Sequence, residues 1–128
     1  GETTPVVVGV DPMGERYTGR VVLMTSPNTV SAGETFAIFM RELPQVTLFG
    51  RPTMGILSDI LNRRLNNGWN FGLSNEIYRT MAGEHFEAVG VPVDVEVNPV
   101  LSLREDRLAG TDVGLDALLT WLDENPVE

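Results

Sequence analysis

Two short apolar runs, separated by one strongly apolar helical segment, constrain the fold of this chain more than any other feature. The first run, residues 19–25, is rich in valine and predicts a buried strand. The helical segment starts at Ser31 and ends before Pro44, where a missing amide stops a helix, and we expect it to be buried over much of its surface. Its apolar residues are Phe36, Ile38, Phe39, Met40 and Leu43. The second run, residues 45–50, predicts another short strand.

A β-hairpin or meander is predicted after these elements. Residues 57–65 and 69–80 read as strand-like stretches on either side of a tight turn. Asn67 and Gly68 supply residues that tolerate the positive φ angles of such a turn. The aromatic side chains that we expect to pack within the hairpin, and not to form a ligand platform, are Trp69, Phe71 and Tyr78.

The last third of the chain predicts a short strand and a closing helix. Residues 82–97 form a loop that runs into the strand, and residues 110–125 form an amphipathic helix with Asp112 as its cap. Gly55 and Gly90 fit turns that need a permissive backbone. The order of elements predicts an α/β fold with a mixed sheet and flanking helices.

Composition narrows the classes of function that this fold can serve. The chain has 128 residues, which fits one domain but is short for a complete two-lobed enzyme. Its net charge of -9 argues against nucleic acid as a partner. It contains no cysteine and only one histidine, His85, which argues against a metal site, and no motif points to a cofactor. No apolar run approaches the roughly 18 residues that a membrane span needs.

Ser31 can be interpreted in two ways from its position alone. Together with Glu34 it has the spacing of a capping box, in which the serine oxygen accepts a hydrogen bond from the third helical amide. A serine that opens a helix also places its oxygen beside free backbone amides and the positive end of the helix dipole, where an oxyanion is stabilised. The pattern leaves both interpretations open.

Four segments carry a resemblance to a known family. Residues 17–37 resemble a strand, a short loop and a nucleophile-bearing helix with a Ser-Ala-x-Glu start. Residues 48–55 contain a Gly-x-x-Thr-x-Gly loop, and residues 87–97 contain Glu-x-x-Gly-Val-x-x-Asp followed by a strand, in which we expect Asp94 to have a structural hydrogen-bonding role. Residues 110–122 resemble the helix that ends the domain. In this order and spacing, the segments resemble the carboxyl-terminal processing (tail-specific) serine peptidases, a family that includes the tricorn core protease.

The resemblance implies roles for individual residues. Ser31 matches the nucleophile, and the amide of Ala32 is the implied oxyanion donor. The branch of the family that uses a Ser-Lys pair has its lysine directly after the Gly-x-x-Thr-x-Gly loop, where this chain has Ile56. This departure indicates either the tricorn-like branch, in which a histidine and an orienting carboxylate serve the serine, or a site that has lost its base. Glu87 is the best positional match for the carboxylate, whereas His85 is not at the family's histidine position and is expected to be solvated.

The resemblance further implies that residues 1–128 are the C-terminal portion of a peptidase domain with a crotonase-like (ClpP/crotonase-related) architecture. The family's upstream strand, Gly-Gly turn and histidine have no counterpart before Tyr17. The implied activity is that of a tail-specific endopeptidase, with a peptide or protein substrate and the remainder of the domain as partners. We expect the chain alone to be inactive and to expose apolar surface that a partner chain or a homo-oligomer covers. The first residues show no export signal, so the protein is either cytosolic or has had a signal removed, and the family implies the second, an exported protein.

Two other functions stay open. A non-catalytic module on the same fold would bind peptides or mediate assembly, with Ser31 acting only as a cap, and Ile56 supports this alternative. A member of the crotonase-like acyl-CoA family would bind a thioester oxyanion with helix amides and would have no reactive serine. The presence or absence of a histidine and a Gly-Gly turn upstream distinguishes the peptidase from the module.

Overall fold

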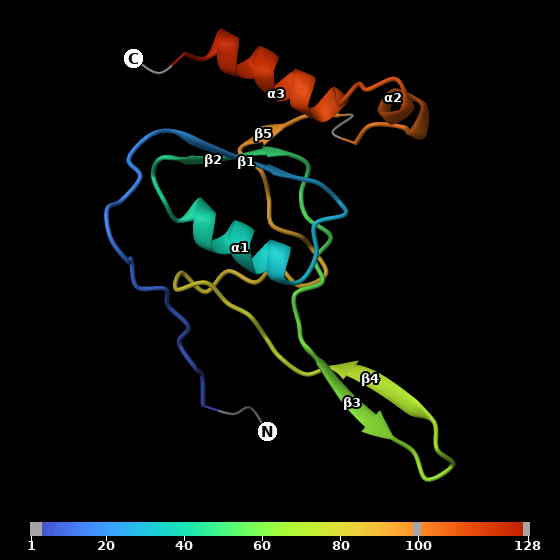
Figure 1. Ribbon diagram of the computed structural model, residues 1–128. Coiled ribbons are helices and arrows are strands. Elements are labelled where there is room, and N and C mark those ends of the chain that lie inside the picture. The colour runs from blue at the N-terminus through green and yellow to red at the C-terminus, as the bar shows by residue number, and fades with distance from the viewer. Residues whose placement is uncertain (1–3, 99–100, 127–128) are drawn as a thin grey trace.

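The computed structural model describes residues 4–98 and 101–126, and its centre is a three-stranded parallel sheet. Strand β1 (Val21–Thr25) pairs with β2 (Val46–Gly50), and β2 pairs with the short β5 (Val95–Glu96), so that β2 lies in the middle. A connection that contains a helix joins β1 to β2, as parallel neighbours require. The predicted strands and the α/β class are confirmed, and Figure 1 shows this arrangement.

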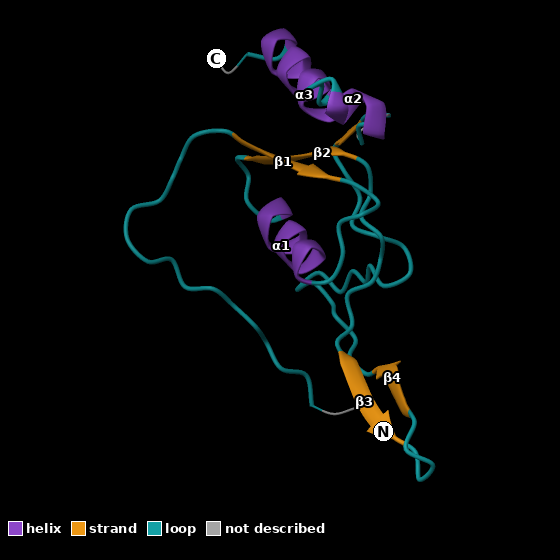
Figure 2. Cartoon of the chain, turned by 45° about the vertical axis from the view of Figure 1, so that its right-hand side comes forward, coloured by secondary structure: helices purple, strands orange, loops and turns teal. Residues whose placement is uncertain are grey.

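Helices cover both faces of the sheet, as Figures 1 and 2 show: α1 (Ala32–Arg41) lies on one face and α3 (Val113–Glu124) on the other. Neighbouring residues of β2 serve the two faces, because successive side chains of a strand point in opposite directions. Leu48 belongs to the core cluster that includes Ala37 of α1. Phe49 packs instead against Trp121 of α3, with ring centroids 5.6 Å apart. The other buried members of the core cluster are Leu57, Phe86 and Val91.

Strands β3 (Ile60–Arg64) and β4 (Asn70–Ser74) form a separate antiparallel hairpin that projects away from the parallel sheet (Figures 1 and 2). The single mixed sheet that the sequence predicted is therefore wrong: parallel and antiparallel pairs occur in two sheets. The short loop allows only an antiparallel return. Gly68 has the expected positive φ of 90°. The φ of Asn67 is not positive, because among the non-glycine residues of the described part of the chain only Ser31 and Ala88 have a positive φ.

The aromatic side chains around the hairpin have different environments. Trp69 is 72% exposed, so the prediction that it packs within the hairpin is wrong. Phe71 is 39% exposed and is therefore only partly covered. Tyr78 lies beyond β4 and packs against the core cluster, so its predicted packing role is confirmed outside the hairpin.

Helix α1 is less buried than its apolar sequence predicted. Only Glu34 and Ala37 are fully buried, whereas the exposed fractions of Phe36, Phe39 and Leu43 are 54%, 38% and 42%. The helix contacts the sheet along one side, whereas Phe36 and Phe39 of the helix, and Leu43 just beyond its end, are partly exposed. Apolar surface is thus exposed on this part of the molecule, as predicted.

Asp94 joins the start of β5 to the central strand. Its carboxylate Oδ2 accepts a hydrogen bond from the amide of Leu48 at 2.7 Å, and its own amide donates to the carbonyl of Leu48 at 2.9 Å. The predicted structural role of Asp94 is confirmed. Helix α2 (Arg104–Leu108) was not predicted, because its single turn carries no apolar periodicity. None of the helices in the described ranges has the length and apolar content needed to cross a membrane.

Asp112 caps α3, as the sequence predicted: its Oδ1 accepts from the amides of Gly114 and Leu115 at 3.2 and 3.1 Å. Replacing Asp112 with alanine leaves two amides unpaired, so we expect the free energy of unfolding in urea to fall by about 1 kcal/mol. Asp112→Asn is the matched control, because asparagine caps as well as aspartate. Equal losses in the two variants would contradict a capping role.

Candidate active site

Ser31 lies in a strained turn between β1 and α1, beyond the carboxyl end of its strand. Its φ and ψ angles are 53° and -121°, in a region that residues with a side chain seldom occupy. Strain of this kind costs of the order of 1–3 kcal/mol and concentrates at functional sites. The side chain is exposed and makes no capping hydrogen bond to the helix. Of the predicted capping box, the hydrogen bond present is from the Ser31 amide to Glu34 Oε2, at 3.2 Å.

The amide of Ala32 is available to an external acceptor. Ala32 is the first residue of α1, and no hydrogen bond from its amide is found within the described residues. The next amide, that of Gly33, donates to the carbonyl of Val30 at 3.0 Å. A free N–H at the positive end of a helix, directly after an exposed serine oxygen, is suited to stabilising negative charge that develops beside that oxygen.

The segment that contains the Gly-x-x-Thr-x-Gly loop runs alongside the loop that leads to Ser31. Three backbone hydrogen bonds join the two segments. In each of them the donor and the acceptor are separated by nearly the same number of residues, so the two segments run side by side in one direction. The three bonds are Arg51 N to Thr25 O at 3.0 Å, Met54 N to Thr29 O at 3.0 Å and Ser31 N to Ile56 O at 2.8 Å. Ile56 therefore lies next to Ser31 and presents an apolar side chain that is 50% exposed.

Glu34 has a second role that the sequence did not reveal. Its side chain is fully buried and accepts from four donors: the Ser31 amide, the Ile56 amide at 2.7 Å, the Gly55 amide at 2.7 Å and the Thr53 hydroxyl at 2.5 Å. In the sequence, Glu34 had a sufficient explanation as the second residue of a capping box, so no further role was predicted for it. The signal for the larger role was a carboxylate on an apolar helix combined with the threonine of the Gly-x-x-Thr-x-Gly loop.

Glu87 lies on the other side of the same segment. Its Oε2 accepts from the amides of Leu57 and Ser58, at 2.9 and 3.0 Å. Within the described residues, Oε1 has no hydrogen-bond donor, and the side chain is partly buried. Since Ser31 bonds to Ile56 and Glu87 to the next two residues, the structure brings Ser31, Ala32 and Glu87 together around one short segment.

His85 is not joined to this group. It is exposed in a loop, as predicted, and its Nδ1 lies 2.9 Å from the carbonyl oxygen of Tyr78. The hydroxyl of Tyr78 donates to Glu76 at 2.8 Å, and this hydrogen bond raises the pKa of Tyr78 above its ordinary value. In the described part of the chain no hydrogen bond links His85 to Ser31 or Glu87, so His85 is not positioned as their base.

Gly55 and Gly90 allow the loops around Glu87 to approach closely. Their φ angles are 82° and 86°, which confirms the prediction that they occupy turns requiring a permissive backbone. A Cβ on Gly90 would lie 2.1 Å from the carbonyl oxygen of Thr53, and one on Gly55 would lie 2.7 Å from the amide of Val89. Neither position accommodates a side chain, so the Thr53 loop and the Glu87 loop are held in contact.

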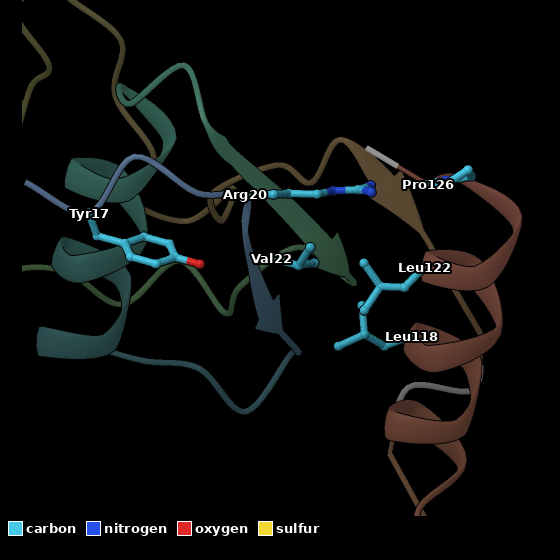
Figure 3. Close-up of a pocket in the computed structure, with 6 residues that line it drawn as sticks. All are labelled: Tyr17, Arg20, Val22, Leu118, Leu122 and Pro126. Carbon is cyan, nitrogen blue, oxygen red and sulfur yellow. The ribbon is translucent and has the colours of Figure 1, made fainter. Parts of the chain in front are cut away.

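An open hollow of about 540 Å³ lies between β1 and α3, as Figure 3 shows. It is lined by Tyr17, Arg20, Val22, Leu118, Leu122 and Pro126. It borders the start of β1, whereas Ser31 follows the end of that strand. The guanidinium of Arg20 stacks 4.4 Å from the ring centre of Trp121 and donates to the carbonyl of Asn125. Within the residues that the structure describes, no cluster of three or more acidic or histidine side chains could hold a metal ion.

Comparison with known proteins gives one family and several similar structures. The family model described as peptidase family S41 matches residues 3–97. A structure from Parabacteroides merdae, described as a candidate peptidase, is 29% identical, with a TM-score of 0.68 over 84% of this chain. The tricorn protease is 27% identical, with a TM-score of 0.65 over 83% of this chain. None of the curated proteins compared with the chain matches it.

The chain also resembles a third structure, and it spans only part of the length of all three proteins. The photosystem II D1 C-terminal processing protease shares the fold, with 24% identity and a TM-score of 0.56 over 76% of this chain. The chain spans 33% of the Parabacteroides merdae protein, 10% of the tricorn protease and 26% of the D1 processing protease. It therefore corresponds to a third or less of the length of each of these proteins.

Proposed function

The chain belongs to peptidase family S41, whose model matches residues 3–97, and from this premise we propose that it is the C-terminal portion of a tail-specific, tricorn-like serine peptidase domain. The observation that carries the proposal is the conformation of Ser31. A strained residue between a strand and a helix, with an exposed oxygen and a free amide next to it, has the geometry of a nucleophile elbow. A serine whose only function was capping would direct its oxygen to the helix amides.

The proposed reaction is peptide hydrolysis through an acyl-enzyme. The Oγ of Ser31 attacks the scissile carbonyl carbon while its proton passes to a base, and the carbonyl oxygen becomes an oxyanion beside the amide of Ala32. Collapse of this intermediate breaks the C–N bond, and the base returns its proton to the departing amine. Water then attacks the ester on Ser31, releases the carboxylic acid and restores the hydroxyl.

We assign the base to a histidine in a part of the domain that this chain does not include. Ile56 lies at the position where the Ser-Lys branch has its base, and the similarity to the tricorn protease supports the alternative branch. Glu87 orients that histidine: its Oε2 is fixed by two amides, which leaves Oε1 to accept the Nδ1–H of an imidazole. The chain alone, without this base, is then inactive.

The same premise extends to the substrate and the location of the protein. The substrate is an extended peptide, held beside a strand edge near its carboxyl terminus, and β1 offers such an edge because, in the described sheet, it pairs only with β2. The exported location rests on the family alone. An assembly with the remainder of the domain, or with further copies of the chain, would cover Phe36, Phe39 and Leu43.

A non-catalytic module is the second candidate, and Ile56 is the observation that favours it. With an isoleucine beside Ser31, no hydrogen bond within the described residues joins the Ser31 hydroxyl to a side chain that could take its proton. A peptide would then bind at the same strand edge without being cleaved. The two candidates differ in one measurable property, the reactivity of Ser31.

Labelling of the complete protein with a fluorophosphonate probe, followed by intact-mass measurement, tests the proposal. We expect one adduct on the wild type and none on Ser31→Ala, because the probe needs an activated serine. Ser26→Ala is the matched control in the same loop and should be labelled like the wild type. Absence of an adduct on the folded wild-type protein would refute the peptidase proposal and favour the module.

A further inference from the structure

Glu34 is a charged side chain in a place where burial is normally costly. Its exposed fraction is 0%, yet its four hydrogen-bond partners are three backbone amides and one hydroxyl, with no cation among them. Burial of a carboxylate is tolerated only when such donors satisfy it. An apolar side chain at this position would leave the same donors unpaired, so the carboxylate and its donors require one another.

All four donors belong to the two segments that form the candidate site. Oε2 accepts from the amides of Ser31 and Ile56, and therefore fixes the backbone of Ser31 against the segment beside it. That segment continues into Leu57 and Ser58, whose amides hold Glu87. Glu34 Oε2 therefore binds the backbone of Ser31 and also the segment whose next two amides bind Glu87.

Thr53 extends this network to the loop that follows Glu87. Its hydroxyl donates to Glu34 Oε1 at 2.5 Å and accepts from the amide of Val91 at 2.7 Å. The backbone amide of Thr53 also donates to the carbonyl of Val91, at 3.2 Å. The hydroxyl is buried and uses both its donor and its acceptor capacity, so it joins the helix of Ser31 to the loop of Glu87.

We infer that Glu34 and Thr53 are positioning residues that set the backbone of Ser31 relative to Glu87. The inference rests on the proposed function and adds residues that touch neither the substrate nor the reacting atoms. The amide of Ser31 is shared between Glu34 Oε2 at 3.2 Å and the carbonyl oxygen of Ile56 at 2.8 Å, and these two acceptors hold the residue at its positive φ. Without the carboxylate, the serine backbone relaxes, and both the oxygen of Ser31 and the amide of Ala32 move.

Three variants test this inference through the reaction of Ser31 with a fluorophosphonate. In Glu34→Gln an NH₂ group must face two donors, and in Thr53→Val the hydroxyl is lost with little change in volume. We expect kinact of both to fall about 100-fold, the loss that follows from a displacement of about 1 Å, while KI changes little. Thr53→Ser keeps the hydroxyl and should recover most of the rate constant. Glu42→Gln, an exposed glutamate at the end of the same helix, is the control.

The outcomes separate this inference from the proposed function. If the wild type is labelled and folded Thr53→Val reacts at the wild-type rate, the positioning role is overturned and the peptidase function stands. A wild type that is not labelled refutes the proposed function itself. Thermal unfolding of each variant identifies loss of fold, and if Glu34→Gln does not fold, Thr53→Val decides. A rise in KI with unchanged kinact would also overturn the inference, because misplacement of the nucleophile acts on the chemical step.

Discussion

Replacement of Ser31 with alanine is expected to lower kcat/KM for peptide hydrolysis by the complete protein about 10⁴-fold or more. The hydroxyl is the only group of the protein that forms a covalent bond to the substrate in the proposed mechanism, so its loss removes the acyl-enzyme route. The amide of Ala32 remains, and with it a small residual rate. The measurement is steady-state cleavage of a fluorogenic peptide, with the substrate first identified on the wild type.

Ser26→Ala controls for disturbance of the same loop. The oxygen of Ser26 accepts a hydrogen bond from the amide of Asn28 at 3.2 Å, which is an ordinary turn interaction. Its removal should change kcat/KM by no more than about twofold. A Ser31→Ala protein that kept the activity of the Ser26→Ala protein would show that Ser31 is not the nucleophile.

Replacement of Gly90 with alanine is expected to lower the free energy of unfolding by about 3 kcal/mol or more. Two costs add at this position. The φ angle of 86° strains any residue with a Cβ, and that Cβ would lie 2.1 Å from the carbonyl oxygen of Thr53. Backbone must move to relieve the contact, since Thr53 is tied to Val91 and Glu34. The midpoint of urea unfolding measures the loss, with an unchanged m-value as evidence that the transition is comparable.

Gly83→Ala separates the two costs. Gly83 has the same φ of 86°, but nothing lies within 4 Å of the position that its Cβ would take. Alanine there should cost only about 1 kcal/mol, the strain of the positive φ. The difference between the variants then measures the close approach of the two loops. Equal losses would contradict the importance of that contact.

The elements with strong local signals could be predicted from the sequence. The apolar runs that became β1 and β2, the turn at Gly68 and the cap at Asp112 each depend on a few neighbouring residues. Local preferences of this kind operate in the unfolded chain as well as in the fold. Asp94 was also interpreted correctly, although its partner, Leu48, is distant in sequence.

Features that depend on contacts between distant segments could not be predicted. The apolar sequence of α1 indicated burial, but how much of a helix is covered depends on which elements pack against it, and Phe36 lies on the uncovered side. The division into two sheets depends on which strands pair, and the strand-like patterns do not encode that choice.

The candidate site shows the same division. The spacing of Ser31 and Glu34 is compatible with a cap and with a nucleophile, because both place a serine at the start of a helix, and the cap is the commoner reason for it. The positive φ of Ser31 and the burial of Glu34 belong to the folded chain, and neither property is visible in a pattern of residue types. The catalytic roles of Ser31, Ala32 and Glu87 stay predictions until the labelling and turnover experiments are done.

The two sheets also imply an order of events during synthesis of the chain. Within the hairpin, Ile60 pairs with Ser74 and Arg64 with Asn70, so its strands meet after closing a short loop, in microseconds. The central strand β2 must wait for a much later partner, because Phe49 pairs with Val95. Such long-range pairing is slow. While residues 51–94 are being translated, one edge of β2 therefore stays open to pairing with other chains, which makes this interval prone to aggregation.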